Sequence, residues 1–223
     1  MAKKILFFNP VYHYKEPLVE DNHRLITRYA SCAVDSLKMS GRSVEHNKSA
    51  GYREFLKGDW DYFMNVDCDI INNNPKNRNM INELIKHGKK VVGGIYVCKR
   101  GDFHPAHRDL KLQKIYEETG EFPKDYVFDI PKELHKVQWL AGGAMLIARE
   151  VIEKLTKKHL IPNLPMIYKG QYLSEDWAFS QRCREEGYEI WADPNLDISH
   201  MGLYGYTLKD YYEYKKMEVE DGR

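Results

Sequence analysis

The sequence of 223 residues predicts an α/β fold in which helices flank a mainly parallel central sheet. Short apolar runs alternate with helical patterns along the first half of the chain, as expected when crossover helices join parallel strands. The apolar fraction of 43% is enough to build a core. The length is typical of one large domain. We therefore expect a single Rossmann-like domain over residues 1–223.

The first part of the chain, residues 1–98, carries the clearest alternation. Four apolar residues at helical spacing (Ile26, Tyr29, Ala33 and Leu37) predict a long amphipathic helix. A second helix is expected to start with Asn74 as its cap and to end at Gly88. The first strand is expected to stop at Pro10. The expected strands are 4–9, 61–66 and 91–97, and the expected helices are about 21–40 and 74–88.

The remainder of the chain is less regular. Residues 99–136 are charged and contain three prolines, and such a long irregular segment in a compact domain is usually functional. We expect this excursion and the loop at 161–173 to wall the acceptor side of a site. A glycine pair, Gly142-Gly143, should interrupt the strand at 137–147. Helices are expected at 110–118, 149–157 and 174–186, short strands at 188–191 and 196–199, and a tail or surface helix at 203–223.

Composition excludes several classes of function. The 34 Lys and Arg nearly balance the 33 Asp and Glu, so no charge excess favours nucleic acid or an anionic membrane. The longest early apolar run, 5–8, is too short for a signal peptide or a membrane span. The four cysteines are far apart and form no C-x-x-C pair, which favours thiols in a reducing compartment. We expect a cytoplasmic protein without a nucleic-acid partner.

An acidic motif directly follows the strand expected at 61–66. Asp67 and Asp69 flank Cys68 at the point where a strand of an open α/β sheet would present ligand-binding residues. Two carboxylates at this spacing can hold Mg²⁺ or Mn²⁺ together with phosphate oxygens. The alternative is a pair of acidic turn residues that accept hydrogen bonds from backbone amides.

Two later motifs also carry candidate chemistry. Ser174-Glu175-Asp176 opens a predicted helix, where the acids either complement the helix dipole or act as a general base. His200 ends the last predicted strand and is followed by Met201-Gly202. His104 and His107 have a spacing seen in metal sites but lack the flanking pattern, so we interpret them as a chance pair.

In this order, the motifs resemble those of GT-A-type glycosyltransferases, which use nucleotide-sugar donors. The resemblance rests on MNVDCDI at 64–70, WLAGGAMLI at 139–147 and SEDWAFSQRCREEGYEIWADPNLDISHMG at 174–202. It covers most of the chain and implies a GT-A-type domain with a nucleotide-binding half at 1–98 and an acceptor and catalytic half at 137–202. The short chain is similar to compact viral or bacterial members. The sixteen Tyr and four Trp suit a sugar-binding cleft.

The resemblance also implies roles for individual residues. Asp67, Asp69 and His200 would hold Mn²⁺ (or Mg²⁺) on the diphosphate of the donor, which is expected to be a UDP-sugar. Asp176, with Glu175, would face a hydroxyl of a glycan or glycoprotein acceptor. The residues implied in nucleotide and donor binding are Asn9, Pro10, Tyr12, Asp67, Cys68, Trp139, Gly142 and Gly143. Whether the reaction inverts or retains the anomeric configuration stays open.

Two alternatives remain from the sequence. In a haloacid-dehalogenase-like phosphatase, Asp67 would be the nucleophile and Asp69 the acid/base, but Ile71 departs from that pattern and the motif does not follow the first strand. A non-catalytic module that binds nucleotide or glycan is the other alternative. A dinucleotide-binding oxidoreductase is excluded because no glycine-rich turn follows the first strand.

Overall fold

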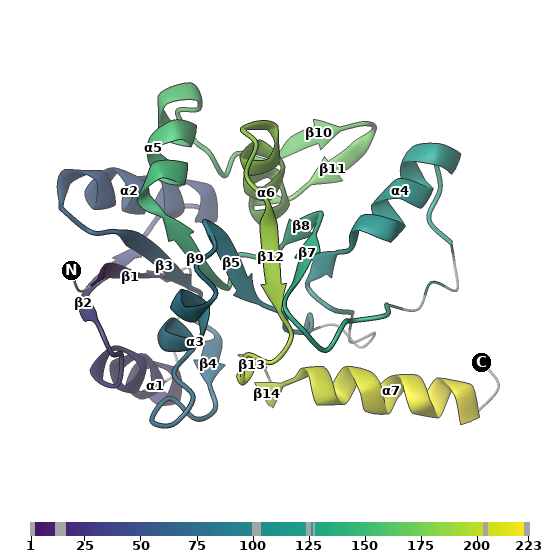
Figure 1. Cartoon of the computed structure of the whole chain (residues 1–223), viewed down its shortest axis with the longest axis horizontal. Helices are drawn as coiled ribbons and strands as arrows, with labels where there is room; N and C mark the ends of the chain where they lie inside the picture. Colours follow the sequence, from purple (N-terminus) through teal and green to yellow (C-terminus); the bar gives the residue numbers. More distant parts are fainter. Residues whose placement is uncertain are drawn as a thin grey trace.

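Figure 1 shows the computed structural model of the chain, which describes residues 3–11, 17–99, 104–123, 126, 128–202 and 205–220. Its main sheet consists of β1 (Lys4–Val11), β2 (Ala33–Ser40), β3 (Tyr62–Val66), β5 (Val91–Gly94), β7 (His135–Val137), β9 (Ala144–Ala148) and β12 (Ile190–Asp193). The strand order is β2-β1-β3-β9-β5-β12-β7. Five strands share one direction, while β9 and β7 run antiparallel to their neighbours. The predicted α/β class is confirmed.

Helices cover both faces of this sheet (Figure 1). They are α1 (Pro17–Arg28), α2 (Val44–Lys57), α3 (Met80–Lys86), α4 (Leu110–Thr119), α5 (Arg149–Lys158), α6 (Glu175–Glu185) and α7 (Leu208–Glu220). The side chains of β1 alternate between two cores. Leu6 and Phe8 pack with residues of α2, α5 and α6, whereas Ile5 and Phe7 pack with α1 and α3 on the opposite face. No helix in the described part of the chain is both long and apolar enough to cross a membrane.

Three small sheets complete the fold. They are formed by β4 (Ile70–Asn72), β13 (Ile198–Met201) and β14 (Gly205–Tyr206), by β6 (His107–Arg108) with β8 (Trp139–Leu140), and by β10 (Met166–Tyr168) with β11 (Gln171–Leu173). The β10–β11 hairpin lies within the predicted loop at 161–173, so that prediction is wrong for its second half. Lys169 and Gly170 both adopt positive φ angles and form a two-residue turn of the kind that favours hairpins.

The long helix predicted over 21–40 is wrong in its second half. The helix ends at Arg28, and residues 33–40 form the edge strand β2, which pairs with all of β1 in parallel. Ala33 and Leu37 lie four residues apart, a spacing that places side chains on one face of a strand as well as of a helix. Helix α2, which follows, has no counterpart among the predictions. It buries the polar side chains of Asn47, Lys48 and Ser49, so its apolar period is weak.

Several predicted boundaries also differ. Asn79 caps α3 by accepting hydrogen bonds from two backbone amides, whereas Asn74 begins a turn in which its carbonyl accepts from the Arg78 amide at 2.8 Å. Beyond Phe8, β3 no longer pairs with β1, so one side of β1 is unpaired at Pro10. The missing N–H of proline is tolerated there, and the first strand continues through this residue. The strand expected at 91–97 ends at Gly94. The predicted break at Gly142-Gly143 is confirmed, since it separates β8 from β9.

Candidate active site

The acidic motif and the glycine pair, which are distant in sequence, lie side by side where β3 ends and β9 begins in the main sheet. Strand β9 runs antiparallel to β3 with Val66 opposite Ala144, so the residues after β3 face those before β9. The Asp67 amide donates to the Gly143 carbonyl at 3.0 Å. Asn65, at the end of β3, donates from Nδ2 to Asp67 Oδ1 at 3.0 Å and to the Gly142 carbonyl at 2.5 Å. The end of β3 is thereby fixed to the glycine turn.

Asp69 and His200 meet through the pairing of β4 with β13. The Met201 amide donates to the Asp69 carbonyl at 2.7 Å, and His200 Nε2 lies 3.4 Å from Asp69 Oδ2. His200 Nδ1 lies 2.8 Å from the Val97 carbonyl. Because a carbonyl only accepts, Nδ1 donates the hydrogen bond to Val97, and Nε2 is the ring nitrogen that faces Asp69. This is the arrangement of a histidine that is oriented to bind a metal.

A lysine also contacts Asp69. Lys99 Nζ lies 2.5 Å from Asp69 Oδ2, so an ammonium group stands where a bound cation would contact this carboxylate. Burial alone would raise the pKa of Asp69, but hydrogen bonds and charge attraction from His200 and Lys99 lower it to about 2. Asp69 is therefore ionised at neutral pH.

The carboxyl groups of Glu175 and Asp176 both lie close to Lys48, which belongs to none of the sequence motifs. Lys48, on α2, is 2% exposed; its ammonium forms an ion pair with Asp176 and lies 3.9 Å from Glu175 Oε1. A Cβ atom at Gly142 would collide with the Asp176 carboxylate and come within 3.1 Å of the Lys48 ammonium. The start of α6 therefore packs directly over the glycine turn. Burial and the neighbouring Asp176 raise the pKa of Glu175 to about 7.

The remaining carboxyl group is that of Asp67, which is half-buried. Burial raises its pKa, and the charges of Asp176 and Asp69 raise it further, while Lys48 opposes the shift. The Tyr96 hydroxyl accepts a hydrogen bond from the Gly143 amide at 3.0 Å. The Tyr96 ring also stands edge-on to His200, with ring centroids 5.1 Å apart. Tyr96, like Lys48 and Lys99, belongs to no sequence motif.

This cluster offers oxygen and nitrogen ligands to a divalent cation. Four carboxyl groups (Asp67, Asp69, Glu175 and Asp176) gather around two ammonium groups (Lys48 and Lys99). Oxygen and imidazole ligands suit Mn²⁺ or Mg²⁺. No three His, Cys, Asp or Glu side chains within the described ranges form a complete protein shell. Asp69 and His200 can therefore supply two ligands, and a bound phosphate group would have to supply others.

The other predicted donor-binding residues occupy different environments. Asn9 is buried beside the end of β3, where its Nδ2 donates to the Val66 carbonyl at 2.7 Å. Pro10 is buried and Cys68 is half-buried. Trp139 lies apart from the cluster: it is fully buried and its Nε1 donates to Gln181 Oε1 at 3.0 Å, so it presents no surface to a ligand in this structure. Tyr12 lies outside the described residues.

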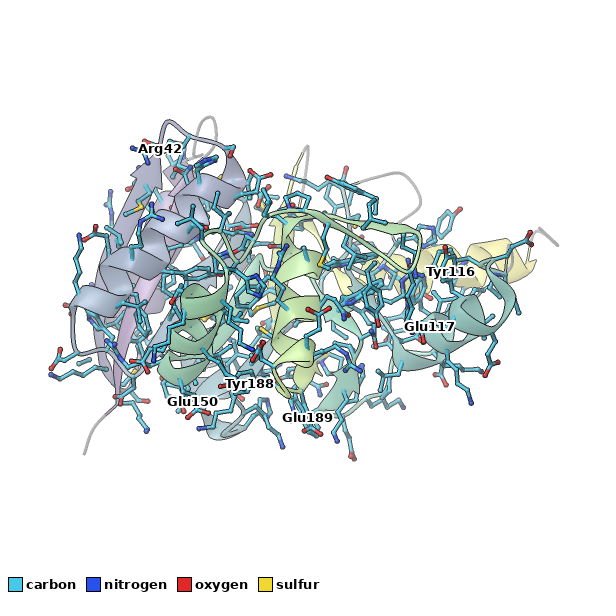
Figure 2. All side chains as sticks on the ribbon, turned by 90° about the horizontal axis from the view of Figure 1, so that it is seen from above. Arg42, Tyr116, Glu117, Glu150, Tyr188 and Glu189 are labelled. Atoms are coloured by element: carbon cyan, nitrogen blue, oxygen red, sulfur yellow. The ribbon has the colours of Figure 1, made fainter. Side chains whose placement is uncertain are left out.

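A cavity of about 720 Å³ adjoins the acidic cluster. Three of its lining residues, Cys98, Ala141 and Ser174, directly precede the cluster residues Lys99, Gly142 and Glu175. Its other walls are rich in aromatic side chains, which come from both irregular segments (Phe122, Tyr126, Phe128 and Tyr172) and from α6 (Trp177). In Figure 2, α4, with Tyr116 and Glu117, lies at the opposite end of the molecule from Arg42. Aromatic walls beside polar groups are typical of sites that bind sugars.

No protein-family model matches the chain, and no curated protein matches it. Among solved structures, the chain is similar to A197 from STIV, with a TM-score of 0.58 and 18% identity over 89% of this chain and 86% of that one. At this identity the likeness shows the fold alone.

Two further similar structures have TM-scores of 0.47, which is too low to support a conclusion. GalNAc-T7 with UDP, GalNAc and Mn²⁺ is 11% identical, over 95% of this chain and 47% of that one, so this chain spans about half its length. UDP-glucose pyrophosphorylase complexed with UDP-glucose is 12% identical, over 99% of this chain and 100% of that one.

Proposed function

We propose that this protein is a metal-dependent glycosyltransferase that moves a sugar from a nucleotide-diphosphate donor, expected to be a UDP-sugar, to a hydroxyl of a glycan or glycoprotein. One observation carries the proposal. The acidic motif after β3, the glycine pair before β9, the acids that open α6, and His200 converge beside an aromatic-walled cavity. Separate metal-binding and proton-accepting groups next to a sugar-sized space are what this reaction requires.

The donor side of the site is assigned to Asp69 and His200, with Asp67 supporting them. Asp69 is ionised, and His200 Nε2 points toward it at 3.4 Å; these two residues would hold Mn²⁺ or Mg²⁺. When bound, the metal supplies positive charge that makes the diphosphate a better leaving group. Lys99, which contacts Asp69 Oδ2, adds a second positive charge for the phosphate oxygens. Asn9, at the end of β1, remains the candidate for contact with the nucleotide.

The acceptor side is assigned to Asp176 and Glu175. The ion pair with the buried Lys48 fixes the orientation of the Asp176 carboxylate above the glycine turn. In an inverting reaction, Asp176 accepts the proton of the acceptor hydroxyl as that oxygen bonds to the anomeric carbon and the bond to the diphosphate breaks. In a retaining reaction, Asp176 or Glu175 instead orients the sugar. With a pKa near 7, Glu175 can also donate a hydrogen bond at neutral pH.

The direct test is turnover. The protein is incubated with Mn²⁺ and a panel of nucleotide sugars, and release of the nucleoside diphosphate is measured with and without glycan acceptors. We expect one UDP-sugar to release UDP only when metal is present, and faster with an acceptor. If every nucleotide sugar stays intact while a phosphomonoester is hydrolysed, the phosphatase alternative holds and the transferase proposal fails.

A substitution at the glycine turn probes the contact between the two sides. Gly142→Ala places a Cβ against the Asp176 carboxylate, so we expect transfer to fall by more than about tenfold, because a small displacement of a catalytic group has large effects. Binding of UDP should change little. Gly187→Ala, in a turn distant from the cluster, strains a left-handed backbone (φ +85°), so it should lower stability but leave transfer by the folded protein unchanged and thus controls for destabilisation. Normal transfer by Gly142→Ala would contradict the close packing of Asp176 on this turn.

A further inference from the structure

One cationic side chain in the adjoining cavity forms no ion pair with any residue that the structure describes. The Arg108 guanidinium lies 4.2 Å from the ring centroid of Phe122 and 5.0 Å from that of Trp177, and it lines the cavity. Its Nε is buried and has no hydrogen-bond partner within the described part of the chain. The aromatic faces stabilise the positive charge, but they leave the Nε–H donor of the guanidinium without a partner.

Asp109, the next residue along the chain, forms no ion pair with this guanidinium. The Asp109 carboxylate accepts a hydrogen bond from the Leu112 amide at 2.6 Å, which caps α4, and another from the Tyr126 hydroxyl at 2.9 Å. No Asp or Glu is present among the described residues that line the cavity. Burial lowers the pKa of Arg108, which reflects the cost of desolvating a charge. A protein accepts such a cost more readily where a ligand supplies the missing anion.

A second polar group in the same cavity also lacks a partner. His107 is 3% exposed and lines the cavity, and its Nδ1 has no hydrogen-bond partner in the described ranges. Burial and the nearby His135 lower the pKa of His107 to about 4, so the ring is neutral at neutral pH. Two adjacent residues that line the cavity, one cationic and one neutral, thus each have a buried nitrogen without a partner among the described residues. Buried polar groups are rarely left unpaired unless a ligand or water completes them.

We propose that this cavity binds the acceptor and that the acceptor is an acidic sugar, whose carboxylate or phosphate group pairs with the Arg108 guanidinium. The inference rests on the proposed function, because it assigns the cavity to the acceptor of that reaction. Guanidinium groups bind both oxyanions through paired N–H donors. Tyr172, which is 67% exposed, offers a face for the sugar ring. Ser174 lines the cavity and precedes Glu175, so a hydroxyl of the bound sugar is directed toward the acids of α6.

The test uses sugar binding in the absence of donor and metal. The protein is titrated with glucose, glucuronic acid and glucose 6-phosphate while amide and arginine Nε–H signals are followed by NMR. We expect glucuronic acid to bind at least about tenfold more tightly than glucose and to shift the Arg108 Nε–H signal. Arg108→Gln should remove this preference, Arg108→Lys should keep part of it, and Arg53→Gln, an exposed arginine of α2, should keep all of it.

The outcomes separate this inference from the transferase proposal. Equal binding of glucose and both acidic sugars, or a preference that survives Arg108→Gln, overturns the assignment to Arg108 even if UDP binds as expected. Binding of glucose 6-phosphate alone that survives Arg108→Gln belongs to the diphosphate site and also counts against it. Arg108-dependent binding of acidic sugars without UDP binding would support the cavity site while the transferase proposal fails. The Arg108 signal of the unmodified protein gives the answer even if a variant does not fold.

Discussion

Asp69→Asn is expected to abolish metal-dependent binding of UDP, with a loss of affinity of more than about 100-fold, while the protein stays folded. The Asp69 carboxylate is ionised at neutral pH because His200 and Lys99 lower its pKa to about 2. A neutral amide removes the charge that attracts a divalent cation. The Asp69–Lys99 pair is about one-third exposed, so its loss should cost less than about 1 kcal/mol of stability. Calorimetric titration of UDP in the presence of Mn²⁺ measures the affinity, and thermal unfolding checks the fold.

A matched control for this variant is Asp59→Asn. Asp59 is an exposed acid that also pairs with a lysine, Lys4, but it lies away from the cluster. We expect this variant to bind UDP like the unmodified protein. If Asp69→Asn keeps full metal-dependent affinity, Asp69 is not a metal ligand, and the donor-side assignment of His200 fails with it.

Asp176→Asn is expected to retain UDP binding but to reduce transfer by about 100-fold to 10,000-fold, the usual contribution of a general base. The amide cannot accept the proton of the acceptor hydroxyl. The change also removes the ion pair between Asp176 and the Lys48 ammonium, which is 2% exposed. We therefore expect a loss of stability on the order of 3 kcal/mol. Initial rates of UDP release with acceptor, together with thermal unfolding, measure both effects.

Glu185→Gln, on the same helix, is the control for Asp176→Asn. Glu185 accepts a hydrogen bond from Gln181 at 3.0 Å, one helical turn away, and lies outside the cluster, so its replacement should leave transfer unchanged. Near-normal turnover by Asp176→Asn would exclude this residue as the base. A stable Asp176→Asn variant would further indicate that Lys48 does not depend on this pair.

The fold class could be predicted because alternating apolar runs and helical patterns are local signals. The nature of residues 33–40 could not, since the spacing of Ala33 and Leu37 suits both a helix and a strand. Pairing with β1 over eight residues decides it, and that pairing is a tertiary contact. Helix α2 gave no clear helical pattern of apolar residues, because it packs polar side chains such as Asn47 against the rest of the protein.

The residues of the candidate site also differ in whether the sequence could reveal them. Asp69, His200, Gly142 and Asp176 belong to motifs whose order along the chain suggested a common site. Lys48, Lys99, Tyr96 and Arg108 belong to no motif, and each acquires its place only through long-range contacts. A lysine in a polar helix is normally solvated, so the sequence gives no sign that Lys48 is buried between carboxylates. Trp139, by contrast, was predicted to bind the donor because it belongs to the motif with the glycine pair, but its side chain is part of the interior.

The central claim is that Asp69 and His200 form a donor site that needs both a metal and a nucleoside diphosphate. The most direct measurement is calorimetric titration of UDP into the unmodified protein with and without Mn²⁺. We predict binding in the presence of Mn²⁺ that is at least about 100-fold weaker without it. Binding of UDP with the same affinity in both titrations, or no binding in either, would contradict the account.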